Sequence, residues 1–186
     1  MENYYYSAKA HTVLAEALTG AELIDATALV NWQRLVKSAE EIGFIRKAAR
    51  ISEKVMAGVL ARAEPGVSQN ELVADMFRDA ILGADGHWGD YAAIVPLMGS
   101  GPDASAPHLT WSDAPLRAGE ATFFEIAGCY RRYHAPICRS VYFGTLPPDI
   151  AHAERALIEG LEAGVEAARP GALAGDVARA LFDALR

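Results

Sequence analysis

The stretch ATFFEIAGCYRRYHAPICRSVYFG, residues 121–144, combines long apolar segments with ionisable side chains. Apolar residues on both sides of Tyr130-Arg131 predict a hairpin with strands at residues 122–129 and 132–143 and a turn near these two residues. Removing a carboxylate or an imidazolium from water costs several kcal/mol unless the group is paired or neutralised. Glu125 and His134 within such strands therefore indicate a site with a chemical role.

Side chains alternate along a strand, so Glu125 shares a face with the residues two positions away, while His134, Pro136 and Cys138 share a face on the second strand. The tight turn puts Glu125 and His134 on adjacent strands, and we expect them to converge on one pocket. A carboxylate beside an imidazole can fix its tautomer, share a proton, or act as base or nucleophile with histidine as the acid.

Purely structural roles are also open for these residues. Glu125 could be a buried partner for Arg131, Arg132 or Arg139, because ion pairs also stabilise charged groups inside proteins. His134 could be an ordinary hydrogen-bonded core histidine. Arg139 could clamp a carboxylate with both guanidinium nitrogens, or it could only pair with Glu125.

The composition of the whole chain limits its class. The 186 residues are 52% hydrophobic, which is ample for a globular core, and carry a net charge of -7. No run of five or more basic residues occurs, so we expect no nucleic-acid partner. Neither an eighteen-residue apolar span nor a signal-type run in the first twenty residues occurs, so we expect no membrane partner.

Two cysteines, Cys129 and Cys138, do not make a disulfide framework in a chain of this length. Small buried hydrophobic residues are their simplest interpretation, since a catalytic cysteine needs an electropositive exposed site. Together with the absence of a signal-type run, this pattern predicts a cytoplasmic protein.

Helical spacing of apolar residues predicts most of the remaining elements. Ser38 with Glu41 forms a plausible capping box for the longest helix, and Ser68 with Glu71 a second one. Residues 23–35 are ambiguous between helix and other structure. The predicted helices span residues 7–18, 39–63, 68–82, 151–168 and 176–185.

Between these helices, the run Tyr-Ala-Ala-Ile-Val predicts a strand at residues 91–98. The next segment, GSGPDASAPHLTWSDAPLRAGE, is rich in proline and glycine and predicts a loop that places His108. Loops on rigid scaffolds often carry functional residues.

The chain also contains two segments with a similar pattern, and we call this internal similarity the echo. Pro65-Gly66 and Pro170-Gly171 each separate two helices, and Phe77 and Phe182 lie at the same distance after their glycine. Any two helical hairpins can share Pro-Gly, so chance similarity is one explanation. The other is a duplicated architecture, in which each half supplies helices and strands around a pseudo-two-fold axis.

Several segments occur in an order that resembles a known family. They are RLVKSAEEIGFIRKAARISEKVM, PGVSQNELV, a strand into GSGPDASAPH, and RAGEATFFEIAGCYRRYHAPICRS. This order resembles the pita-bread superfamily that contains aminopeptidase P, prolidase, methionine aminopeptidase and creatinase. The resemblance covers residues 31–186 and implies an α+β fold with helices packed on a curved antiparallel sheet. It also explains the echo as the two halves of a pseudo-symmetric fold.

The resemblance implies a division of the chain into two parts. Residues 1–36 correspond to the end of an N-terminal domain, and residues 37–186 to the N-terminal portion of a pita-bread catalytic domain. The C-terminal part of that domain, which supplies a further histidine and two glutamates in the family, is absent from this sequence. We therefore expect a truncated fold with an incomplete pocket, and a homodimer in the full-length form.

The metallopeptidases of this superfamily bind metal with two aspartates of the hairpin. Alignment on Arg139-Ser140 puts Glu125 at the first aspartate and Pro136, eleven residues later, at the second. Because proline cannot bind a metal, the resemblance implies the metal-free creatinase branch, with no metal and no cofactor. Creatinase has a carboxylate where Cys138 stands, which argues against creatine as the substrate.

That branch hydrolyses C–N bonds of small nitrogenous compounds. A closer likeness to one group of its members, through HLTWSD, GEATFFEIAGCYRRYH and the opening MENYYYSA with LVNW, implies ring-opening hydrolysis of ectoine, or a similar cyclic amidine, to N-acetyl-diaminobutyrate. The expected catalytic residues are His108 as proton shuttle, Glu125 as base or nucleophile, and His134 as proton carrier. Tyr133 and Arg139 are expected to bind substrate. Two other functions stay open, namely a metal-dependent Xaa-Pro aminopeptidase or dipeptidase and a non-catalytic binding module.

Overall fold

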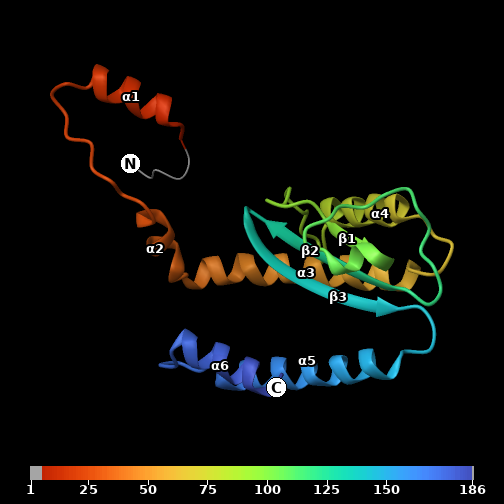
Figure 1. Cartoon of the computed structure of the whole chain (residues 1–186). Coiled ribbons are helices and arrows are strands. Elements are labelled where there is room, and N and C mark those ends of the chain that lie inside the picture. Colours follow the sequence, from red (N-terminus) through yellow and green to blue (C-terminus); the bar gives the residue numbers. More distant parts are fainter. Residues whose placement is uncertain (1–5, 186) are drawn as a thin grey trace.

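The computed structural model describes residues 6–185. Residues 1–5 and 186, which fall inside the two expected domain ranges, lie outside this part. The helices are α1 (Ala8–Ala17), α2 (Leu29–Leu35), α3 (Ala39–Arg62), α4 (Gln69–Leu82), the 3₁₀ helix η1 (Gly101–Ser105), α5 (Pro148–Ala167) and α6 (Ala174–Ala184), and the strands are β1 (Leu97–Ser100), β2 (Ala121–Tyr130) and β3 (Tyr133–Tyr142) (Figure 1).

The described strands form one antiparallel sheet in the order β1-β2-β3. The predicted hairpin is confirmed, with long curved strands β2 and β3 (Figure 1). Its turn is Arg131-Arg132, one residue later than expected, and both residues have positive φ, 48° and 68°. Two residues with positive φ are typical of the tight turn that matches the twist of a hairpin.

The prediction of a strand at residues 91–98 is wrong, because β1 begins only at Leu97. Asp90 donates its N–H to the carbonyl of Cys129 at 2.8 Å, and Leu97 pairs with Glu125. Asp90 and Leu97 are seven residues apart in the chain, but their partners on β2 are only four residues apart. The extra residues therefore bulge out of the sheet. We call this irregular segment, residues 90–96, the strap.

Helix α3 covers one face of the sheet and carries much of the core. Its capping box is confirmed, since Ser38 Oγ accepts from the N–H of Glu41 at 3.3 Å and the Glu41 carboxylate accepts from the N–H of Ser38 at 2.6 Å. C-terminal to the cap, α3 buries one of its faces against the apolar face of the hairpin, as expected for apolar residues with a 3.6-residue period. The buried residues shared by this interface include Ala48, Ile51, Val55, Val59, Phe124 and Ile126.

Ser52 connects α3 to the hairpin by hydrogen bonds at the point where the helix and the strands lie closest together. Its hydroxyl accepts from the N–H of Gly128 at 2.8 Å and donates to the carbonyl of Ala135. Gly128 is required there, because a Cβ at this position would lie 2.3 Å from the Ala48 carbonyl oxygen. The hydroxyl thus links both strands of the hairpin to the helix.

Helix α4 packs beside α3 and buries Leu72, Val73 and Met76 in the same core. The cap predicted for Ser68 is wrong, because its side chain caps no helical N–H. The hydroxyl instead donates to the Asn70 side chain and, at 3.4 Å, to the carbonyl of Asp113. The hydroxyl therefore bonds to Asn70 and to the loop before β2, and not to a backbone N–H of the helix.

The other predicted helices are confirmed within a few residues, and the ambiguous segment is helical over Leu29–Leu35. Helices α5 and α6 pack on each other, with Gly160 and Gly164 of α5 against Leu181 of α6. The echo is therefore real as helix–Pro-Gly–helix, although strands accompany only its first copy within residues 6–185. Figure 1 shows this pair apart from α3 and α4, below β3 in this view, and α1 with α2 extending beyond the N-terminal end of α3.

No helix within residues 6–185 is both long enough and apolar enough to cross a bilayer.

Candidate active site

The face of the hairpin that turns away from α3 carries the predicted site residues. Glu125 lies directly opposite Cys138, and the next pair along this face is Ala127 with Pro136. His134 follows on the same face, opposite Cys129. The alternation expected along each strand is confirmed, and the register brings Glu125, His134, Pro136 and Cys138 onto one face. We call this surface the Glu125 face.

The Glu125 carboxylate is half-buried and open. It makes no hydrogen bond or ion pair within residues 6–185, so the alternative of an arginine partner fails for this part of the chain. Its nearest ionisable neighbour across the strands is the Cys138 thiol. Burial, and then the negative charge of Glu125, raise the pKa of Cys138, which keeps this thiol protonated at neutral pH.

His134 does not converge with Glu125, and that expectation is wrong. Its partner Cys129 lies four residues along β2 from Glu125, a separation of about 13 Å at strand rise. His134 Nε2 instead accepts a hydrogen bond of 3.0 Å from the backbone N–H of Ala93 in the strap. An imidazole that accepts at Nε2 is neutral and carries its proton on Nδ1.

His108 follows η1 and lies beside β1. The next residue, Leu109, accepts a backbone hydrogen bond from Met98 at 3.3 Å, and β1 separates this segment from β2. At two strand spacings, the His108 backbone is about 10 Å from that of Glu125. His108 is exposed and has φ of 62°, a sparsely populated region that functional residues often occupy.

Tyr133 and Arg139 lie on the opposite face from Glu125, because they alternate with His134 and Cys138 along β3. Arg139 Nη1 donates to the Cys138 carbonyl at 2.6 Å, and the Tyr133 hydroxyl donates to Glu41 Oε1 at 2.7 Å. These two side chains therefore do not lie on the Glu125 face, and the expectation that they bind substrate stays a prediction.

The Tyr133–Glu41 contact changes the acidity of both groups. Hydrogen bonds from the Ser38 backbone and from Tyr133 lower the pKa of Glu41 to about 2. The same bond to the carboxylate raises the pKa of Tyr133. Tyr133 therefore fastens the end of the hairpin to the start of α3.

Sequence reasoning missed the strap as part of this site. Besides the bond to His134, Arg132 donates to the Tyr91 carbonyl and lies over the Tyr91 ring, 3.7 Å from its centroid. The run Tyr-Ala-Ala-Ile-Val signalled a strand, so no local signal pointed to these contacts. The position of Cys138 opposite Glu125 could have been found, because a two-residue turn at Arg131-Arg132 fixes the register of the hairpin.

Comparison with known proteins places this geometry in a family. Residues 43–186 match the model of metallopeptidase family M24. The chain belongs to family M24. The resemblance to the pita-bread superfamily is thereby confirmed.

Individual M24 relatives agree with this assignment. The ectoine hydrolase of Halomonas elongata is 48% identical, over the whole of this chain and 48% of the relative. The dipeptidase PepE of Mycobacterium ulcerans superposes with a TM-score of 0.82 at 32% identity, covering 98% of this chain and 48% of PepE. The prolidase of Pyrococcus horikoshii gives a TM-score of 0.88 at 20% identity, over 98% and 51% of the two chains. The fold is the pita-bread fold, and the chain spans about half the length of these relatives.

The family name implies a metal centre, and the residues of this chain do not fit one. Pro136, at the expected second ligand position, has no side-chain donor for a metal. Within residues 6–185, no group of three or more His, Cys, Asp or Glu side chains is placed to hold a metal ion. The Glu125 face is therefore better suited to proton transfer and nucleophilic chemistry.

Proposed function

We propose that this M24 chain forms part of a hydrolase that opens the ring of ectoine, giving N-acetyl-diaminobutyrate without a metal ion. The observation that carries the proposal is the open carboxylate of Glu125 on a face where Pro136 holds the second ligand position. The 48% identity to the Halomonas elongata ectoine hydrolase supports the choice of substrate. The peptidase relatives support only a hydrolase of this fold.

The proposed chemistry uses Glu125 and His108. Glu125, as base, takes a proton from water while the water oxygen attacks the amidine carbon. One ring C–N bond then breaks, and His108 supplies the proton that the departing nitrogen needs. The separation of about 10 Å between the two backbones leaves room for a six-membered ring between the side chains.

Glu125 could instead attack the amidine carbon directly and form a covalent intermediate. A single turnover in ¹⁸O-labelled water separates the two routes. With Glu125 as base, the label enters the product at once. With Glu125 as nucleophile, water attacks the Glu125 carbonyl carbon of the intermediate, and the bond from this carbon to the bridging oxygen breaks. The first product then carries the unlabelled Glu125 oxygen, and the label remains on Glu125, which mass spectrometry of the peptide detects.

The decisive test incubates the longest natural form of the protein that carries this chain with ectoine and follows ring opening by proton NMR. Glu125→Gln should lower the rate about 100-fold or more, because acid–base catalysis contributes about 10²–10⁴. Glu162→Gln, an exposed carboxylate on α5, is the matched control and should keep full activity. Normal turnover by Glu125→Gln would overturn the assignment of Glu125.

A second candidate, a metal-dependent dipeptidase, is favoured by the likeness to PepE. Binding of about two divalent ions per chain together with cleavage of Xaa-Pro dipeptides would establish it and overturn ectoine hydrolysis. A binding module would show no turnover of either substrate, and Glu125→Gln would bind ectoine as tightly as the wild type.

Two further expectations remain proposals. We propose that the domain division falls near residues 36–38, between α2 and α3, where limited proteolysis should cleave first. We also propose a homodimer for the full-length form, which sedimentation of the same protein tests.

A further inference from the structure

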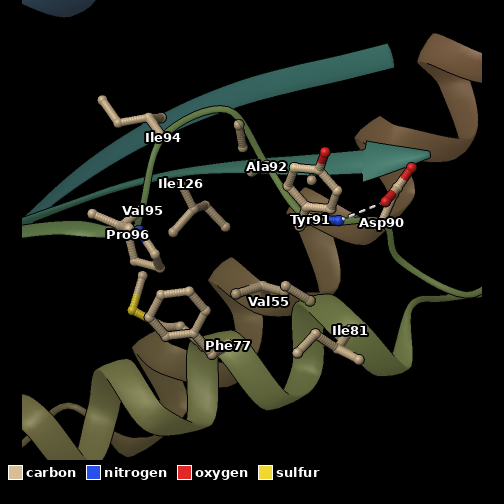
Figure 2. A pocket seen from close by; sticks show the side chains of 14 residues that line it. Val55, Phe77, Ile81, Asp90, Tyr91, Ala92, Ile94, Val95, Pro96 and Ile126 are labelled. Atoms are coloured by element: carbon tan, nitrogen blue, oxygen red, sulfur yellow. Dashed lines mark hydrogen bonds between the residues drawn. The ribbon is translucent and has the colours of Figure 1, made fainter. Parts of the chain in front are cut away.

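A cavity of about 340 Å³ lies between α4 and the strap. Figure 2 shows Val55 and Phe77 on one side of it, and Ile126 with Val95 and Pro96 of the strap on the other. An apolar cavity of about 150 Å³ is enough for benzene, and sites for small ligands begin at about 300 Å³. The cavity is therefore large enough for a compact organic molecule.

The bulge of the strap explains why this space is not filled. The strap has three residues more than the ladder between Asp90 and Leu97 requires, so it arches over the edge of β2. Ile94 and Val95 remain 43% and 42% exposed, and Ile81 of α4 is 61% exposed at the same opening. Apolar side chains thus line a space that solvent can enter.

Two ionisable residues, Asp90 and Tyr91, line the cavity, and Asp90 is its one carboxylate among the lining residues. Its Oδ1 accepts the N–H of Tyr91 at 2.9 Å, and its Oδ2 has no hydrogen-bond partner within residues 6–185. The side chain is only 20% exposed. Because Oδ2 has no donor in the described part of the chain, it is free to accept a hydrogen bond from a ligand.

Arg132 does not fully neutralise Asp90. Its Nη1 lies 3.8 Å from Oδ1, too far for a hydrogen bond, because the guanidinium is engaged with the ring and carbonyl of Tyr91. The negative charge of Asp90 also raises the pKa of the neighbouring Cys129 thiol, after the larger effect of burial. The end of the cavity at Asp90 therefore retains negative character.

We propose that this cavity binds a small apolar molecule that carries an ammonium group. The apolar body occupies the space between α4 and the strap, and the ammonium donates to Asp90. Glu125 and His108 do not line the cavity, although Ala127 of the Glu125 face does, and the proposed binding does not depend on the proposed hydrolysis. A bound ligand would also steady the strap, whose Ala93 holds His134.

The test titrates this chain by calorimetry with three probes that share one aromatic body, namely 1-naphthylmethylamine, 1-naphthalenemethanol and 1-naphthoate. We expect the amine to bind at least tenfold more tightly than the alcohol, and the carboxylate most weakly. Asp90→Asn should reduce the advantage of the amine to less than threefold and leave the alcohol unchanged. The control Asp85→Asn, which removes an exposed carboxylate paired with Arg50, should keep the full advantage.

The cavity itself is tested by Ala80→Leu, which places a larger side chain in the space that Ala80 lines. This variant should lose binding of both amine and alcohol while its thermal unfolding temperature does not fall. Unchanged binding by Ala80→Leu, or equal binding of amine and carboxylate by the wild type, would overturn the proposal. Amide chemical shifts of the wild type supply a readout without a variant. Shifts at Ile81, Tyr91 and Val95 are expected, and shifts confined to other elements, or none at millimolar probe, would also overturn it.

Discussion

The backbone N–H of Ala93 donates a hydrogen bond of 3.0 Å to Nε2 of His134, which joins the strap to β3. A hydrogen bond of this kind contributes about 1 kcal/mol net, so its loss should open the strap about fivefold more often. We predict that His134→Ala exchanges the Ala93 amide about fivefold faster than the wild type. Hydrogen exchange followed by NMR measures this rate.

His134→Gln is the matched variant, because the amide oxygen of glutamine can accept the same bond. Its Ala93 amide should exchange nearly as slowly as in the wild type. Equal protection in wild type and His134→Ala would mean that the contacts of Asp90 and Tyr91 alone hold the strap.

The Tyr133–Glu41 bond predicts a specific acid sensitivity. The pKa of Glu41 falls from 4.5 to about 2 in the folded protein, because Ser38 and Tyr133 donate to its carboxylate. A carboxyl group with a lowered pKa stabilises the fold above its unfolded pKa, and this stabilisation disappears as the pH falls towards 2. Urea unfolding at pH 6, 4, 3 and 2 should therefore show Glu41→Gln less stable than wild type at pH 6, with the gap closing by pH 2.

The neighbouring Glu40→Gln is the control for that series, because the carboxylate of Glu40 makes neither the capping bond nor the bond to Tyr133. Its difference from wild type should change little between pH 6 and pH 2. A constant gap between wild type and Glu41→Gln across the whole series would contradict the role assigned to the ionised carboxylate.

Local sequence patterns were sufficient to predict the helices and the hairpin, because the residues that form each pattern lie close together in the chain. Helical spacing ended by Pro-Gly predicted α3 and α4, and apolar segments around a tight turn predicted β2 and β3. The strap shows where this reasoning fails. Its apolar run favours a strand, but pairing at Asp90 and Leu97 with positions only four residues apart on β2 forces it out of the sheet.

For the site, sequence alternation was enough to place His134, Pro136 and Cys138 on one face of their strand, but the register was needed to join that face to Glu125 and to give the distance to His134. The same alternation puts Arg139 on the other face of β3. The hydroxyl of Ser52 and the N–H of Ala93 act through contacts between residues far apart in the chain. No local pattern encodes such contacts, so they emerge only from the fold.

Ser52 is predicted to be a strong determinant of stability. It is buried, and Ser52→Ala leaves the N–H of Gly128 and the carbonyl of Ala135 without their shared partner. Each buried group left unsatisfied costs about 1–3 kcal/mol, so we expect the free energy of unfolding to fall by at least about 1–3 kcal/mol. Urea denaturation followed by circular dichroism measures the change.

Ser105→Ala tests whether any serine would have this effect. Ser105 is exposed and donates only to the Pro102 carbonyl within η1. Its substitution should change stability by less than about 0.5 kcal/mol. Similar losses in the two variants would show that Ser52 does not link the helix to the hairpin as described.

Gly128 and Gly43 should respond to alanine in opposite directions, although both are near α3. At Gly128 a Cβ would lie 2.3 Å from the Ala48 carbonyl oxygen and 2.7 Å from the Ser52 nitrogen. Backbone atoms cannot rotate away, so Gly128→Ala must push the hairpin off α3, and we expect a loss of about 2 kcal/mol or more. At Gly43, inside α3, nothing lies within 4 Å, and alanine should stabilise the helix by about 1 kcal/mol. Urea unfolding of both variants against wild type measures the pair, and a stable Gly128→Ala would refute the close approach of α3 to the hairpin.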